Sequence, residues 1–181
     1  YQPNESFIAL KSNQGKVTHY NIVLPMQAIL HSVKKPDPNE TLPTNRKVDK
    51  KRATDFGLEY LLRRARSGEW ICPPLTLRLQ TSDLVSVKPI GNDGTVVRIE
   101  VPKLRQWLIH DGQHRALGTH AFHEELKGLI ANFQDQADKA RINGDKQLEN
   151  WNLKQAEEHR TILGDVLDRS TVLLTLVVAS S

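Results

Sequence analysis

Five consecutive residues with polar or unusual chemistry stand between an apolar run and a helix-like run. They are Asp111, Gly112, Gln113, His114 and Arg115, within the stretch LIHDGQHRALGTHAF. A glycine between a strand and a helix adopts dihedral angles that other residues avoid, and it lets an anion approach the main chain. The unpaired N–H groups at the start of the following helix also favour an anion. The stretch therefore predicts an anion-binding site.

Each polar side chain of this stretch fits a role beside a phosphate. The guanidinium of Arg115 matches phosphate as a planar fork, and His114 can donate to a phosphate oxygen or act as an acid or base. Asp111 can cap the helix, orient His114 or hold a metal ion, and Gln113 can orient water. A purely structural interpretation stays open: Asp111 caps the helix, Gly112 makes the turn, and Arg115 pairs with an acid elsewhere.

A basic region precedes this stretch in the chain. Between Arg46 and Arg66 there are eight basic and three acidic residues, and the whole chain carries a net charge of +4. Such a region is either a solvated helix face or a surface that faces the phosphates of a nucleotide or nucleic acid.

The sequence lacks the known motifs of several other functional classes. The chain has no GxxxxGK[ST], GxGxxG, GxSxG or zinc-finger spacing, so the familiar nucleotide-binding and hydrolase motifs are absent from the sequence. The histidines between His110 and His123 do not follow HExxH, and we predict no metal site built from them. The single cysteine, Cys72, fits a reducing cytoplasm and a buried structural role. No apolar run is long enough to span a bilayer, so we expect a cytoplasmic protein without membrane contact.

The elements that must position these residues follow from hydrophobic periodicity and turn residues. Alternating or apolar runs predict strands at 6–12, 17–25, 70–80, 84–90, 95–102, 106–110 and 170–181. Helices are predicted at 26–33, at 50–68 with Asp49 as its cap, and from about Arg115 onward. The DGQHR residues therefore lie between a short buried strand and a helix.

A charge-rich helical excursion follows. Residues 124–142 and 146–167 have helical periodicity and are separated by Asn143–Asp145, which predicts an antiparallel hairpin inserted as an appendage. Residues 1–123 and 170–181 would then form the core domain, and 124–169 the inserted hairpin. The apolar seam of the hairpin is predicted to contain Leu126, Ile130, Phe133, Ala137, Ala140, Leu148, Trp151, Leu153 and Ile162.

The motifs resemble those of a known family. IHDGQHRALG resembles the signature of the DGQHR-domain family, whose DndB-like members belong to bacterial DNA phosphorothioation (DNA sulfur modification) systems. ALKSNQGKVTHYNIVLPMQAI resembles the family's opening hairpin. TNRKVDKKRATDFGLEYLL resembles its second motif, an asparagine–arginine pair that leads into a helix.

The two motifs together resemble the wider ParB and sulfiredoxin superfamily, in which two such boxes form one pocket for nucleotide phosphates. This resemblance implies an α+β fold, with a mixed sheet, helices and the inserted helical hairpin. It also implies that Asn45 and Arg46 face Gly112, His114 and Arg115, with Lys50 and Arg52 as additional phosphate contacts. Gln113 stands where sulfiredoxin has its catalytic cysteine, which excludes sulfiredoxin chemistry.

The resemblance implies a DNA-binding regulatory protein of a sulfur-modification or related defence system. We expect it to bind ATP or CTP, with Mg²⁺, and to act as an NTPase at the DGQHR pocket. Arg46 and Arg115 would clamp the phosphates, and the Gly112 backbone would cradle them. Asp111 would orient a metal ion or water, Gln113 would position water, and His114 would donate a proton or contact the γ-phosphate. DNA would contact Arg63, Arg64 and Arg66.

Two other functions stay open at this point. The first is a metal-dependent nickase or nuclease, for which acidic residues near the motif are few. The second is a non-catalytic DNA-binding or assembly module. In that case residues 46–66 contact DNA, and the hairpin at 124–169 mediates homo-oligomerisation or partner docking.

Overall fold

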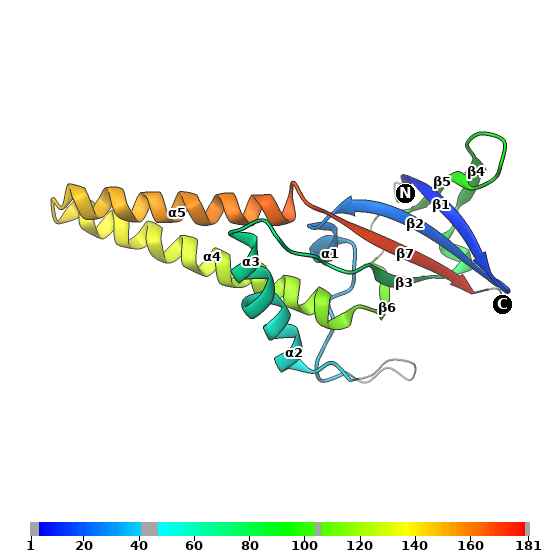
Figure 1. The fold of residues 1–181 in the computed structure, drawn as a ribbon, viewed down its shortest axis with the longest axis horizontal. Coiled ribbons are helices and arrows are strands. Elements are labelled where there is room, and N and C mark those ends of the chain that lie inside the picture. Colours follow the sequence, from blue (N-terminus) through cyan, green and yellow to red (C-terminus); the bar gives the residue numbers. More distant parts are fainter. Residues whose placement is uncertain (1–3, 41–46, 104–105, 180–181) are drawn as a thin grey trace.

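A seven-stranded mixed sheet forms the body of the protein (Figure 1). The computed structural model describes residues 4–40, 47–103 and 106–179. The strands are β1 (Asn4–Gln14), β2 (Val17–Pro25), β3 (Leu75–Leu79), β4 (Ser86–Pro89), β5 (Val96–Pro102), β6 (Leu108–Asp111) and β7 (Thr171–Ala179). Their spatial order is β4-β5-β1-β2-β7-β3-β6, with β3 parallel to β7 and the other neighbours antiparallel. The predicted α+β class with a mixed sheet is confirmed.

Two predicted hairpins are confirmed as β1–β2 and β4–β5. The turn between β1 and β2 contains Gly15 at φ +59°, a left-handed conformation that glycine adopts without strain. The short strand β6 pairs with β3 at one edge of the sheet, where Thr76 lies opposite Asp111. The DGQHR residues therefore start at a sheet edge.

The hydrophobic core lies where one face of the sheet meets several helical elements. They include α1 (Ala28–His31), η1 (Asp55–Leu62), the first half of α4 (Gln113–Ile142) and the end of α5 (Lys146–Leu167). Alternation along β3 buries Leu75, Leu77 and Leu79 and turns the residues between them to the other face. A short 3₁₀ turn, η2 (Thr81–Asp83), follows β3. No helix within the described ranges is long and apolar enough to cross a membrane.

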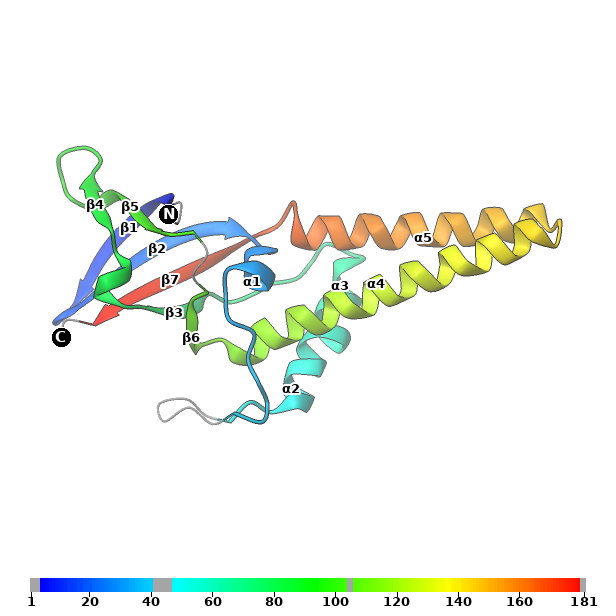
Figure 2. The same cartoon turned by 180° about the vertical axis from the view of Figure 1, so that it is seen from behind.

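The two longest helices form the predicted antiparallel hairpin, which projects far from the sheet (Figures 1 and 2). They are α4 and α5 (Lys146–Leu167). Gly144 at φ +74° makes the turn, and the Asp145 side chain accepts a hydrogen bond from the N–H of Leu148 to cap α5. Helix α4 runs without interruption from the DGQHR residues to the tip, so the boundary predicted after residue 123 falls inside one helix. The division into two domains stays a prediction.

The predicted seam of the hairpin is confirmed on α4 and only in part on α5, where Ile162 packs against the core and the ring of Trp151 lies edge-on to that of Phe133. Leu126, Ala137 and Ala140 of α4 are buried, whereas three predicted seam residues of α5, namely Leu148, Trp151 and Leu153, are exposed. The buried positions on α5 are Glu149, Asn152, Ala156, His159 and Val166. The C-terminal end of α5 explains this, because Val166 and Leu167 belong to the main core. The earlier residues of α5 that share a helix face with Val166 and Leu167 are mostly polar, and these are the residues that become buried.

Residues 50–65 of the basic region form one continuous helical segment, the basic helix, which crosses α4 (Figures 1 and 2). It consists of α2 (Lys50–Thr54), the π-helical η1, and α3 (Arg63–Ala65). As predicted, the Asp49 side chain caps it, accepting from the N–H groups of Lys51 and Arg52 at 2.9 and 3.3 Å. Gly68, at φ +76°, follows its end.

Candidate functional site

The turn between β6 and α4 depends on Gly112. This residue is the N-cap of α4 at φ +105°, a left-handed conformation that strains other residues. A Cβ atom here would lie 2.9 Å from Cγ of Leu75 and 3.1 Å from a terminal nitrogen of Arg115. No side chain of the described residues caps α4, so Asp111 does not cap it as the structural interpretation proposed. The first N–H groups of the helix are thus left for an anion.

Arg115 lies in the first turn of α4 with its side chain largely covered. Its Nη2 atom donates to the carbonyl oxygen of Pro74 at 2.8 Å and lies 3.9 Å from a carboxylate oxygen of Asp111. The Nε atom is buried and has no hydrogen-bond partner within the described segments. These contacts hold the guanidinium beside the start of α4 and leave donors without a protein acceptor.

His114 joins the DGQHR residues to the basic helix. Its Nε2 atom accepts a hydrogen bond of 2.9 Å from the backbone N–H of Asp49, so Nδ1 carries the ring proton. Burial lowers the pKa of His114, and so do the positive charges of Arg52 and, to a smaller extent, Arg115, while Asp49 opposes them. The ring is therefore neutral at pH 7. Proton donation by His114, which stays a prediction, would have to use Nδ1.

Two glycines bring the basic helix into close contact with α4. A Cβ atom on Gly57 would overlap the carbonyl oxygen of Gly118, and one on Gly118 would lie 2.5 Å from the carbonyl oxygen of Ala53. Both glycines are buried inside helical segments. The backbones of η1 and α4 therefore touch directly, so Arg52 and the start of α4 border one space.

That space is a cavity of about 1130 Å³ that contains all five DGQHR residues. Its remaining lining is Arg52, Phe56, Tyr60, Ile71, Pro73, Thr76 and His110. Of these, only Arg52 was predicted as a site residue. The cavity combines two arginines and an uncapped helix start with two aromatic rings, a composition suited to a ligand that is part anion and part apolar.

Lys50, another predicted phosphate contact, is not among the described residues that line this cavity. Lys50 lines a separate cavity of about 520 Å³, together with Lys35 and His120 on the other side of α2. Lys50 and Arg52 are two residues apart, and such positions do not face the same side of a helix. Asn45 and Arg46 lie outside the described residues.

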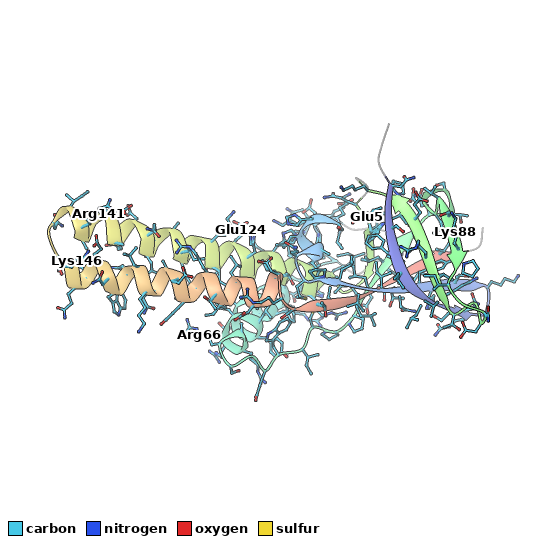
Figure 3. The ribbon with its side chains drawn as sticks, turned by 90° about the horizontal axis from the view of Figure 1, so that it is seen from above. Glu5, Arg66, Lys88, Glu124, Arg141 and Lys146 are labelled. Atoms are coloured by element: carbon cyan, nitrogen blue, oxygen red, sulfur yellow. The ribbon has the colours of Figure 1, made fainter. Side chains whose placement is uncertain are left out.

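The predicted DNA contacts lie at the far end of the basic helix, outside the cavity. Arg63 is exposed and forms an ion pair with Glu59 at 3.4 Å. The guanidinium of Arg64 lies over the ring of Tyr60, 5.4 Å from its centroid. Arg66 is exposed where the segment ends beside the hairpin (Figure 3).

Sequence reasoning missed several residues that shape the site. Besides Phe56 and Tyr60, these include His110, whose Nδ1 atom contacts Nη2 of Arg78 at 2.9 Å. A spacing of four between Arg52, Phe56 and Tyr60 was visible in the sequence and marks one helix face. The contact between His110 and Arg78 had no such signal, because it depends on the pairing of β3 with β6.

A metal site made of protein ligands alone finds little support here, and neither does thiol chemistry. No cluster of three or more His, Cys, Asp or Glu side chains suited to a metal occurs among the described residues. Cys72 lies near Arg115, but burial raises the pKa of its thiol to about 11. It therefore stays protonated, in line with the structural role expected for it.

Comparison with known proteins identifies the family. The family model of DndB, described as DNA-sulfur modification-associated, matches residues 7–139, which include every residue that lines the cavity. No curated protein and no solved structure matches the chain. The wider ParB and sulfiredoxin relationship stays a prediction. Because the match extends over well over half of the 181 residues, the chain belongs to the DndB family of DNA-sulfur modification-associated proteins.

Proposed function

We propose that the cavity at the DGQHR residues binds the phosphates of a nucleoside triphosphate, and that this binding serves a regulatory role in DNA sulfur modification. The observation that carries the proposal is the convergence of Arg52, Arg115 and the uncapped start of α4 on one cavity. Two guanidinium groups supply charge-assisted hydrogen bonds, and the helix start supplies backbone donors. The family match supports the setting in DNA sulfur modification.

The residues divide into those that bind and those that position. Arg52 and Arg115 contact phosphate oxygens, and the main chain at Gly112 gives them a close approach. His114 positions α2 through its hydrogen bond to Asp49. This assignment differs from direct phosphate contact by His114, and it agrees with the neutral state of its ring.

Mg²⁺ fits the site as a companion of the nucleotide. Asp111 lines the cavity, and its side chain is 76% exposed, so its carboxylate is open to an ion. Mg²⁺ in nucleotide sites is held by one or two carboxylates together with the phosphates, so this single acid suffices. The ion would neutralise charge on the phosphates, and Gln113 would orient the water that attacks during hydrolysis.

A ligand screen tests the proposal. ATP, CTP and inorganic tripolyphosphate, each with and without Mg²⁺, are added to the full chain, and the unfolding temperature is measured. A ligand at one hundred times its Kd stabilises the native state by about 2.7 kcal/mol. The proposal predicts a rise with at least one nucleoside triphosphate, and no rise with any of them would refute it.

The nickase alternative has weaker support in the cavity. Asp111 is the only acidic side chain among the described lining residues, whereas two-metal cleavage of DNA relies on a cluster of ligands. A plasmid-nicking assay with Mg²⁺ or Mn²⁺ separates the two functions. Nicking that disappears in Asp111→Ala would favour the nuclease.

DNA binding is proposed for the outer end of the basic helix. Arg63 and Arg66 are exposed there, and they lie away from the nucleotide cavity. Nucleotide and DNA could therefore be bound together, as a nucleotide-responsive regulator requires. Homo-oligomerisation or partner docking through residues 124–169 stays a prediction.

A further inference from the structure

One face of the basic helix lines the cavity with a basic residue followed by two aromatic residues. Arg52, Phe56 and Tyr60 follow one another at intervals of four, and all three line the cavity. We infer that Phe56 and Tyr60 form the wall that binds the base of the nucleotide, so that the site selects nucleoside phosphates over inorganic phosphates. This inference rests on the proposed function of the same cavity.

The positive charge in the cavity surrounds His114. Arg115 follows His114 in the first turn of α4, and the charges of Arg52 and Arg115 both lower the pKa of His114. Phe56 and Tyr60 follow Arg52 along the helix, and the hydroxyl of Tyr60 contacts the N–H of Ile71. A ligand with phosphates at one end and a flat apolar group at the other matches this division.

The two rings are held in place before any ligand arrives. Their centroids are 5.7 Å apart, with 31° between the planes. The hydroxyl of Tyr60 accepts a hydrogen bond of 2.8 Å from the N–H of Ile71, and the guanidinium of Arg64 lies over its ring. Fixed rings lose little conformational entropy on binding, which favours stacking against a base.

The same division favours a free nucleotide over a nucleic-acid strand. A strand carries a phosphate at every nucleotide, so its channel needs cations along its whole length. Arg52 and Arg115 are the two arginines among the described lining residues, and Arg64 is not one of them. Beside Tyr60 the lining is apolar, because Ile71, whose N–H donates a hydrogen bond to the hydroxyl of Tyr60, also lines the cavity. The cavity thus fits a single base attached to its phosphates.

The test compares ATP with inorganic tripolyphosphate by calorimetry on the full chain. We expect the wild type to bind ATP more tightly, and Phe56→Leu to weaken ATP about fivefold or more while leaving tripolyphosphate unchanged. Phe133→Leu, in the hairpin, is the matched control and should bind both as the wild type does. Equal affinity of the wild type for both ligands would overturn the base wall and leave the phosphate site intact. Binding of neither would overturn the proposed function, and the base wall with it.

A second measurement does not depend on any variant folding. Photo-crosslinking of 8-azido-ATP to the wild type should label the tryptic peptide 53–63, which contains both rings. Unlabelled ATP should compete for this labelling. Labelling confined to other peptides would overturn the assignment, and so would competition by a single-stranded oligonucleotide at lower concentration than ATP.

Discussion

The backbone N–H of Asp49 donates a hydrogen bond to Nε2 of His114, 2.9 Å away and 65 residues later in the chain. This bond links the helix that carries Arg52 to the helix that carries Arg115. The two arginines proposed to bind phosphate belong to different elements, so the bond contributes to their relative position. On this basis we propose that the histidine of the DGQHR motif acts as a positioning residue.

Removing the acceptor should loosen the start of α2. His114→Ala is expected to lower the free energy of unfolding by about 1 kcal/mol and to speed amide hydrogen exchange at Asp49. His114→Gln keeps an oxygen acceptor at a similar reach and should restore much of the protection. Denaturant unfolding and hydrogen exchange measure the two effects. Exchange at Asp49 that is the same in all three proteins would contradict the role of this bond.

The contact of η1 with α4 should not tolerate a methyl group. Gly118→Ala would place Cβ 2.5 Å from the carbonyl oxygen of Ala53, so we expect a loss of about 1–3 kcal/mol of stability and weaker ATP binding. Gly128→Ala, on the same helix with nothing within 4 Å of its Cβ, is the matched control. It should gain about 0.5–1 kcal/mol. Equal effects of the two changes, measured by denaturant unfolding, would show that the helices are not in backbone contact.

Acid should destabilise the fold through His120. Burial lowers the pKa of this side chain to about 4, with a smaller contribution from Lys35. The unfolded chain takes up the proton at its ordinary pKa, near 6.5, whereas the folded protein resists it. The contribution of the neutral ring is therefore complete above pH 6.5 and is lost as the pH falls toward 4.

The matched variant for this effect is His120→Gln, which cannot take up the proton. We expect the difference in unfolding free energy between wild type and variant to shift by several tenths of a kcal/mol or more from pH 7 to pH 5, to the disadvantage of the wild type. Urea unfolding at the two pH values measures it. A constant difference would show that the pKa of His120 is unperturbed.

Arg63 and Arg66, at the outer end of the basic helix, should set the salt dependence of DNA binding. Each phosphate contact contributes about 0.9 to the slope of log K against log salt concentration. Replacing Arg63 and Arg66 by glutamine should reduce the slope by up to about 2 and leave ATP affinity unchanged. Fluorescence anisotropy with a DNA duplex at several salt concentrations gives the slope. An unchanged slope would place the DNA elsewhere.

Local signals account for the parts that could be predicted from the sequence. Alternating strands, glycine turns and the Asp49 cap act over a few residues, so the two β-hairpins, the basic helix and the helical hairpin were predictable. The position of Gly112 between strand and helix was predictable for the same reason. These features place the DGQHR residues at the start of a helix but say nothing of what faces them.

The features that could not be predicted depend on packing between residues far apart in the sequence. The buried face of α5 is set by Val166 and Leu167 in the core, and for that reason Trp151 is exposed against expectation. Lys50 and Arg52 were both predicted to contact phosphate in one pocket. Because they are two residues apart on a helix, they face different sides and line different cavities. Gly57 and Gly118 did leave a signal, since each is a glycine within a helical pattern with no turn to explain it.

The affinity of Arg115→Ala for ATP tests the phosphate site most directly. This change removes a guanidinium that lines the cavity while leaving the turn at Gly112 in place. Calorimetry should show a Kd about tenfold or more above that of the wild type, as loss of a charge-assisted hydrogen bond implies. Arg141→Ala, at the hairpin tip (Figure 3), should bind as the wild type does. If Arg115→Ala keeps the circular dichroism spectrum and the ATP affinity of the wild type, the DGQHR residues are not the phosphate site.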